Sequence, residues 1–128
     1  MLAVVEIPNL VPFEEMANRL GMAIDGIKFE KEETGRFEEV STFIGKDLNS
    51  SAKFTLFGIP EGEFGDAYTL EMSAETALSI HDFKKSTIKF MNSFIDEKIV
   101  NSRGYLDYSD ELANALIMKG ITAFKPSL

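Results

Sequence analysis

Four strand-like runs follow one another between residues 27 and 72, and this succession constrains the fold more than any other feature of the chain. In the clearest run, Tyr68, Leu70 and Met72 alternate with polar residues, as in a strand with one buried face. Strands joined by short connections pair in antiparallel fashion, so we expect an antiparallel sheet. The other three runs cover residues 27–31, 37–44 and 54–57.

Further patterns precede these runs. A short apolar strand is expected over residues 2–7. Phe13, Met16 and Leu20 then recur at helical spacing and predict a helix with one apolar stripe. Gly21 follows the stripe, and glycine is a common residue at helix ends, so we expect the helix to end there.

The last third of the chain has helical periodicity. A broad apolar face predicts a long helix from about residue 79 to residue 101, with Phe90 and Phe94 packed against the sheet. Ser109 is expected to start a shorter helix, because two acidic residues follow it in the first turn. A final strand is expected over residues 121–124.

Together these elements predict an α+β fold, with an antiparallel β-sheet of about four to six strands and helices packed mainly on one face. At 128 residues the chain has the length of one domain, so we expect residues 1–128 to form a single globular domain. No apolar run reaches the roughly 20 residues that a membrane-spanning helix needs. The absence of cysteine and of a basic N-terminal segment favours the cytoplasm.

Negative charge is concentrated in the first two thirds of the chain. Residues 1–80 hold 15 acidic and 6 basic side chains, a net charge of −9, whereas residues 81–128 hold 6 acidic and 7 basic side chains, a net charge of +1. Nucleic acids and anionic membranes are bound by clustered Lys and Arg, so the charge argues against both as partners. A basic protein is the partner that the charge favours.

Side chains suited to catalysis or metal binding are few. His81 is the only histidine, and the chain has no cysteine, so the usual zinc ligand set is missing. The sequence around His81 supplies neither a nucleophile nor an orienting group. Residues 107–111 are acidic but lack the spacing of a calcium loop, and a capped helix start explains them better. We therefore expect no catalytic residue, no metal site and no cofactor.

Two acidic clusters are the candidate partner-binding residues. One cluster flanks a turn expected at Thr34 and Gly35, on a predicted hairpin. The other surrounds a glycine-rich loop that has no basic residue and carries Phe64 as a candidate apolar anchor. Lying on consecutive strands, the clusters can merge into one negative surface, although a solvated, solubilising edge also explains each of them. The candidate residues are Glu32, Glu33, Glu38, Glu39, Glu61, Glu63, Phe64 and Asp66.

The leading hypothesis is a small acidic inhibitor that binds a protein. The familiar class of this kind is the bacterial immunity protein, which neutralises a basic, nuclease-type toxin by binding it, with carboxylates in place of substrate phosphates. One alternative is a client binder similar to type III secretion chaperones, which are small, acidic and generally dimeric. Another is a small-ligand or enzyme domain that uses the sheet face, with polar groups from His81, Tyr68, Tyr105 or Tyr108. The oligomeric state is left open.

Overall fold

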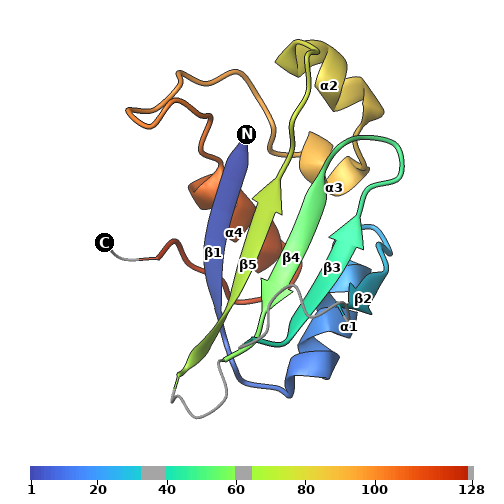
Figure 1. Cartoon of the computed structure of the whole chain (residues 1–128), viewed down its shortest axis with the longest axis vertical. Helices are drawn as coiled ribbons and strands as arrows, with labels where there is room; N and C mark the ends of the chain where they lie inside the picture. The colour runs from blue at the N-terminus through green and yellow to red at the C-terminus, as the bar shows by residue number, and fades with distance from the viewer. Residues whose placement is uncertain (33–39, 60–64, 127–128) are drawn as a thin grey trace.

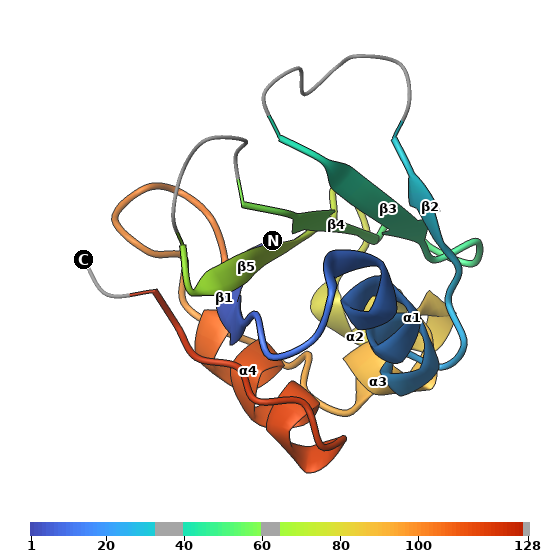
Figure 2. The same cartoon turned by 90° about the horizontal axis from the view of Figure 1, so that it is seen from below.

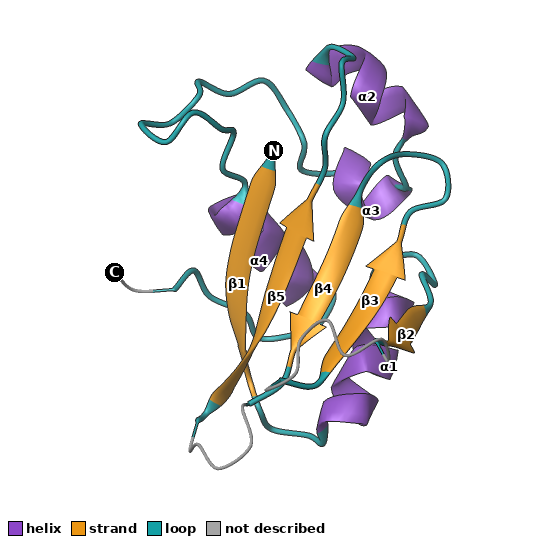
Figure 3. Cartoon of the chain, in the orientation of Figure 1, coloured by secondary structure: helices purple, strands orange, loops and turns teal. Residues whose placement is uncertain are grey.

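The computed structural model describes residues 1–32, 40–59 and 65–126. Within them, five strands form one antiparallel sheet in the order β1-β5-β4-β3-β2, and the α+β fold expected from the sequence is confirmed (Figure 3). The strands are β1 (Leu2–Pro8), β2 (Phe29–Lys31), β3 (Thr42–Lys46), β4 (Lys53–Phe57) and β5 (Ala67–Ser73). The helices are α1 (Phe13–Ala23), α2 (Ile80–Ser86), α3 (Lys89–Asn92) and α4 (Ser109–Met118).

The four helices lie on one face of the sheet, as expected (Figures 1 and 2). Alternation along the strands explains this layering, because Leu70 and Met72 of β5 and Val5 of β1 are fully buried while the residues between them turn to the other face. No described helix covers that other face. The β2 and β3 strands are the described parts of two predicted runs, and the turn expected at Thr34 and Gly35 lies outside the described residues.

Helix α1 buries the predicted apolar stripe, but its predicted end was wrong. The helix continues through Gly21 to Ala23. A Cβ atom on Gly21 would lie 2.5 Å from the carbonyl oxygen of Ile27, so this glycine lets the returning chain approach the helix closely. The backbone turns instead at Asp25 and Gly26, which have φ angles of 53° and 75°.

The long helix expected over residues 79–101 was also wrong. The segment forms two short helices, α2 and α3, and the backbone is extended at Ile88 between them (φ −63°, ψ 156°). The Ile88 amide donates to the Asp47 carboxylate at 3.1 Å, and the Phe90 amide donates to the Asp25 carboxylate at 2.6 Å. Two carboxylates from distant loops thus cap a new helix start and favour a break that local periodicity does not predict.

The aromatic residues that follow still reach the sheet. Phe90 is buried and its ring lies 6.5 Å from that of Phe54 on β4. Phe94 is half-buried, with its ring 5.6 Å from Phe90 and 6.5 Å from Tyr108. The predicted packing of this segment against the sheet is therefore confirmed for Phe90, and Phe94 closes the side of the core next to α4.

The free edge of β1 is covered near both of its ends. The carbonyl group of Leu2 accepts a hydrogen bond from the Tyr108 amide at 2.9 Å. Further along, Glu6 and Phe124 exchange two backbone hydrogen bonds of 2.8 and 3.0 Å. This single bridge replaces the strand predicted over residues 121–124, which was wrong. Pairing at isolated points shields the edge without extending the sheet.

Candidate functional site

Two connections start at the same end of the sheet. Because β2, β3, β4 and β5 run as an antiparallel meander, the chain leaves β2 and β4 at one end and enters β3 and β5 at that end (Figure 1). The Gly58 amide, just after β4, donates to the carbonyl oxygen of Ser41, just before β3, at 2.9 Å. This hydrogen bond joins the bases of the two connections.

The sequence-predicted site residues belong to these connections. Asp66 is exposed at the start of β5, and its carbonyl oxygen accepts the Asn9 amide at 3.0 Å. Glu32 is half-buried at the end of β2, and its amide donates to the carbonyl oxygen of Thr42 at 3.0 Å. Both described members therefore lie at one end of the sheet, as the hypothesis of a merged negative surface requires. Six others lie outside the described residues: Glu33, Glu38, Glu39, Glu61, Glu63 and Phe64.

Helix α1 adds two carboxylates that the sequence analysis did not include among the candidate residues. The Phe13 ring lies 5.1 Å from Phe43 on β3 and 5.2 Å from Tyr68 on β5. This contact anchors the start of α1 below the end of the sheet, where Glu14 and Glu15 are exposed. In the sequence, this position is indicated only by Phe13, the aromatic residue directly before Glu14 and Glu15. We call Glu14, Glu15, Glu32 and Asp66 the acidic end.

Charge differs between the two ends of the sheet. At the acidic end, Glu15 forms an ion pair with Arg19 at 3.7 Å, and both side chains are about half exposed. Lys31, exposed at the end of β2, offsets part of the negative charge there. At the opposite end, Lys46 and Lys53 are directly opposed on β3 and β4. Exposed charges of this kind contribute little to stability, but they do shape the field that an approaching molecule meets.

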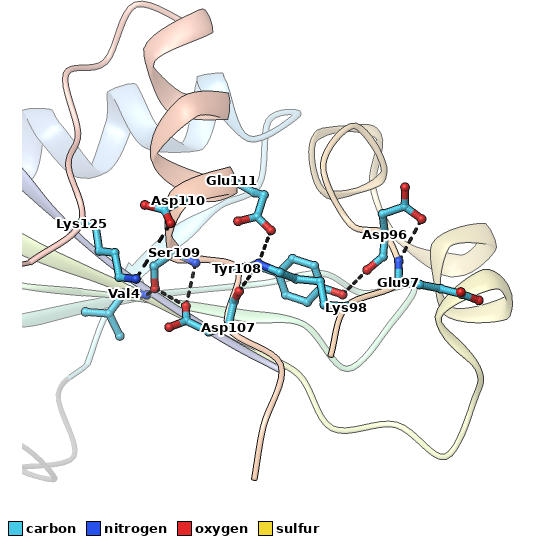
Figure 4. Close-up of polar contacts among 10 residues, drawn as sticks. All are labelled: Val4, Asp96, Glu97, Lys98, Asp107, Tyr108, Ser109, Asp110, Glu111 and Lys125. Carbon is cyan, nitrogen blue, oxygen red and sulfur yellow. Dashed lines mark hydrogen bonds and ion pairs between the residues drawn. The ribbon is translucent and has the colours of Figure 1, made fainter. Parts of the chain in front are cut away.

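A second polar cluster precedes α4 (Figure 4). The Ser109 hydroxyl donates to the Asp107 carboxylate at 2.6 Å and accepts the Val4 amide at 2.9 Å. The expectation that Ser109 starts this helix is confirmed, since Ser109 is the first residue of α4, and its amide donates to the Asp107 carboxylate at 2.9 Å. Ser109 is only 5% exposed and its hydroxyl is occupied on both sides, so the cluster joins α4 to the edge of β1.

Hydrogen bonds and charges around this cluster determine the pKa of Asp107. Burial by itself would raise the pKa of Asp107, but the two hydrogen bonds from Ser109, together with Lys125 and Lys98, hold that pKa below its ordinary value. The Lys98 ammonium group also contacts the Asp107 carbonyl oxygen at 2.5 Å and the Glu111 carboxylate at 2.6 Å. The ionised form of Asp107 is thus the one that the fold stabilises.

The polar groups named in the enzyme hypothesis do not share one surface. The Tyr68 hydroxyl donates to the Val11 carbonyl oxygen at 2.8 Å on the helix side of the sheet, and burial raises the pKa of Tyr68. The Tyr108 hydroxyl donates to the Asp96 carbonyl oxygen, and burial and nearby acidic groups raise the pKa of Tyr108. His81 is exposed on α2. In the described ranges, no group of three His, Asp or Glu side chains is arranged to hold a metal ion.

Two open grooves mark the described surface. One, of about 610 Å³, lies between β2, β3 and the loop after α1, and its walls mix carboxylates such as Glu30 and Asp47 with ammonium groups such as Lys28 and Lys46. The other, of about 410 Å³, lies beside α1 and has mainly apolar walls. In the small-ligand alternative, which names the sheet face, the first groove is a described concave surface beside the sheet.

The chain matches no protein-family model, no curated protein and no solved structure. None of the helices in the described ranges is long and apolar enough to cross a membrane.

Proposed function

We propose that this protein is a small acidic binding protein that neutralises a basic protein partner through the acidic end of its sheet. The mode of action proposed is that of a bacterial immunity protein acting on a nuclease-type toxin. Carboxylates occupy the positions that substrate phosphates would take on the toxin. The role needs no catalytic residue, metal, cofactor, nucleic acid or membrane, and the cytoplasm is the proposed location.

The hydrogen bond between Gly58 and Ser41 is the observation that carries this proposal. It joins the bases of the two connections in which the sequence concentrates its acidic clusters, so both clusters begin at one end of the sheet. The first turn of α1 brings Glu14 and Glu15 to the same end. Three separate segments thus contribute negative charge to one region, and such a concentration attracts a basic protein and speeds its association.

The test is to express the chain together with a tagged product of each adjacent gene and to measure binding to the one that co-purifies. Two charge-reversed variants are compared: Glu33→Lys with Glu38→Lys and Glu39→Lys, and Glu61→Lys with Glu63→Lys and Asp66→Lys. Glu75→Lys with Glu97→Lys is the matched control, since these exposed acids lie away from the acidic end. Weaker binding by at least one of the first two variants, with the control unchanged, supports the proposal. Unchanged binding by both would remove its basis.

The two alternative functions predict other outcomes in the same experiments. A chaperone-like client binder is expected to be a dimer in sedimentation measurements and to bind an unfolded segment independently of the acidic end. A small-ligand domain is expected to lose its activity on substitution of residues in the mixed-charge groove, such as Lys28 or Lys46, while its protein contacts stay intact.

A further inference from the structure

The groove beside α1 is lined mainly by apolar residues. Its volume is about 410 Å³, and it lies between α1 and the segment that follows α4. Figure 2 shows the chain from β1 to α1 running between these two elements. The lining residues are Ile7, Pro8, Leu10, Val11, Met16, Arg19, Met22, Ala23, Lys119, Gly120, Ile121 and Thr122.

Large apolar side chains at this groove face solvent. Leu10 is 80% exposed and Met22 is 82% exposed, whereas Ile7 and Met16 form a buried floor. Exposed apolar surface next to a concave site is typical of a surface that another molecule covers. Methionine adapts its shape to different apolar partners, and Met22 stands at the rim where an occupant would enter.

The walls of the groove are held in place by the backbone. On one side, Gly120 has a φ angle of 85° and the Ile121 amide donates to the Leu116 carbonyl oxygen at 3.0 Å, which ends α4 sharply. The bridge between Glu6 and Phe124 then keeps this segment beside β1. The groove is therefore formed without an occupant, which lowers the entropic cost of binding.

The charge at the groove is opposite to that of the whole chain. Arg19 and Lys119 are its charged lining residues, and no carboxylate lines it, although the chain carries a net charge of −8. Arg19 has one weak partner, Glu15 at 3.7 Å, and both side chains are about half exposed. An apolar floor with two cationic groups at the rim complements an apolar segment flanked by carboxylates.

We propose that the α1 groove is a second interaction surface, which takes an amphipathic acidic segment of a partner protein. Apolar side chains of that segment lie against Ile7, Met16 and Ile121, and its carboxylates pair with Arg19 and Lys119. This surface adjoins the acidic end, since Arg19 pairs with Glu15 and the Asn9 amide binds the Asp66 carbonyl oxygen, but it selects the opposite charge. The inference stands whether or not the proposed inhibitor function is correct.

A pair of synthetic peptides tests this proposal. Both peptides carry leucine at positions i, i+3, i+4 and i+7 of a helix, one with glutamate and the other with lysine at the remaining positions. The net charge of the chain alone favours the lysine peptide, whereas the groove favours the glutamate peptide. At physiological ionic strength the Debye length is about 8 Å, so the groove charges dominate over distant ones.

We expect the glutamate peptide to bind roughly tenfold more tightly than the lysine peptide, the effect of two exposed ion pairs. In NMR spectra of the protein, the amide chemical-shift changes caused by the glutamate peptide should centre on Leu10, Met22 and Ile121. Arg19→Glu with Lys119→Glu should reverse the preference, and Leu10→Glu should abolish binding. Leu48→Glu is the matched control, because Leu48 is 94% exposed and lies outside this groove.

Three results would overturn the proposal. Tighter binding of the lysine peptide, or equal binding of the two peptides, would show that the groove has no preference for acidic segments. Shift changes centred elsewhere, or absent, would show that the groove is not the binding surface. Concentration-dependent dimerisation that Leu10→Glu removes would show that a second copy of this chain occupies the groove instead.

Discussion

The backbone amide of Val4 donates a 2.9 Å hydrogen bond to the hydroxyl oxygen of Ser109, a residue 105 positions later in the chain. On both sides of this contact the edge of β1 is paired through backbone groups, at Leu2 and at Glu6. The hydroxyl of Ser109 thus occupies a position that a neighbouring strand would otherwise fill. It prevents a half-buried amide from being left without a partner and joins α4 to the sheet.

Ser109→Ala is expected to lower the free energy of unfolding by about 1–3 kcal/mol, because it leaves the Val4 amide without an acceptor. Urea denaturation followed by circular dichroism measures the change. Ser51→Ala is the control, since Ser51 is exposed in a turn and should change stability by less than about 0.5 kcal/mol. Equal midpoints for the two variants would show that the Ser109 contact is not stabilising.

Asp107 is expected to make stability depend on pH in the acid range. The pKa of Asp107 is lower in the folded protein than in the unfolded chain. Its contribution to the free energy of unfolding is therefore fully present above the unfolded pKa of about 4. The contribution is lost as the pH falls through the folded pKa. Asp107→Asn should therefore be less stable than the wild type at neutral pH, and the difference should shrink on acidification below about pH 4. A difference that is constant from neutral to acid pH would contradict this.

The two carboxylates that start α3 are expected to control local order. Asp47 is 4% exposed and also binds the amide of Asn49 and the hydroxyl of Ser50. Asp47→Ala should cost about 1–3 kcal/mol and speed amide exchange at Ile88, because several donors lose their acceptor. Asp25→Ala should cost about 1 kcal/mol and affect Phe90. Unchanged exchange at both amides would exclude the capping role.

These capping residues also show where sequence analysis fails. The alternation at Tyr68, Leu70 and Met72 and the stripe of α1 are local patterns, and both predicted their elements correctly. The break at Ile88 depends on two distant carboxylates, Asp47, 41 residues from Ile88, and Asp25, 65 residues from Phe90. Helical periodicity continues across the break, so the distant caps, which appear only once the fold is formed, decide the outcome.

Phe90 and Phe94 are expected to differ in their contribution to stability. Phe90 is 3% exposed and packs against Phe54, so Phe90→Ala should cost about 3–5 kcal/mol. Phe94 is half-buried, so Phe94→Ala leaves a smaller cavity and should cost less. Thermal or urea unfolding of both variants shows which of them loses more stability. A larger loss of unfolding free energy for Phe94→Ala than for Phe90→Ala would show that the core is centred closer to α4.

The candidate site was predicted in part. Acidic composition identified the clusters around Glu32 and Asp66, and the meander places both at one end of the sheet. The contribution of α1 was missed, because Glu14 and Glu15 have a sufficient local explanation at the positive end of the helix dipole. Only the packing of Phe13 beneath β3 and β5 shows that this helix starts at the acidic end.

The association rate with the co-purifying partner tests the central claim most directly. Stopped-flow measurements compare the wild type, Glu14→Lys with Asp66→Lys, and the control Glu75→Lys with Glu97→Lys. Between 0.1 M and 1 M salt the Debye length falls from about 10 Å to about 3 Å, so steering by exposed charges weakens. We expect the wild-type rate to fall as salt rises. Charge reversal at the acidic end should slow association by on the order of tenfold at low salt, whereas the control should not. A wild-type rate that is independent of salt and unchanged by reversal at the acidic end would contradict this expectation.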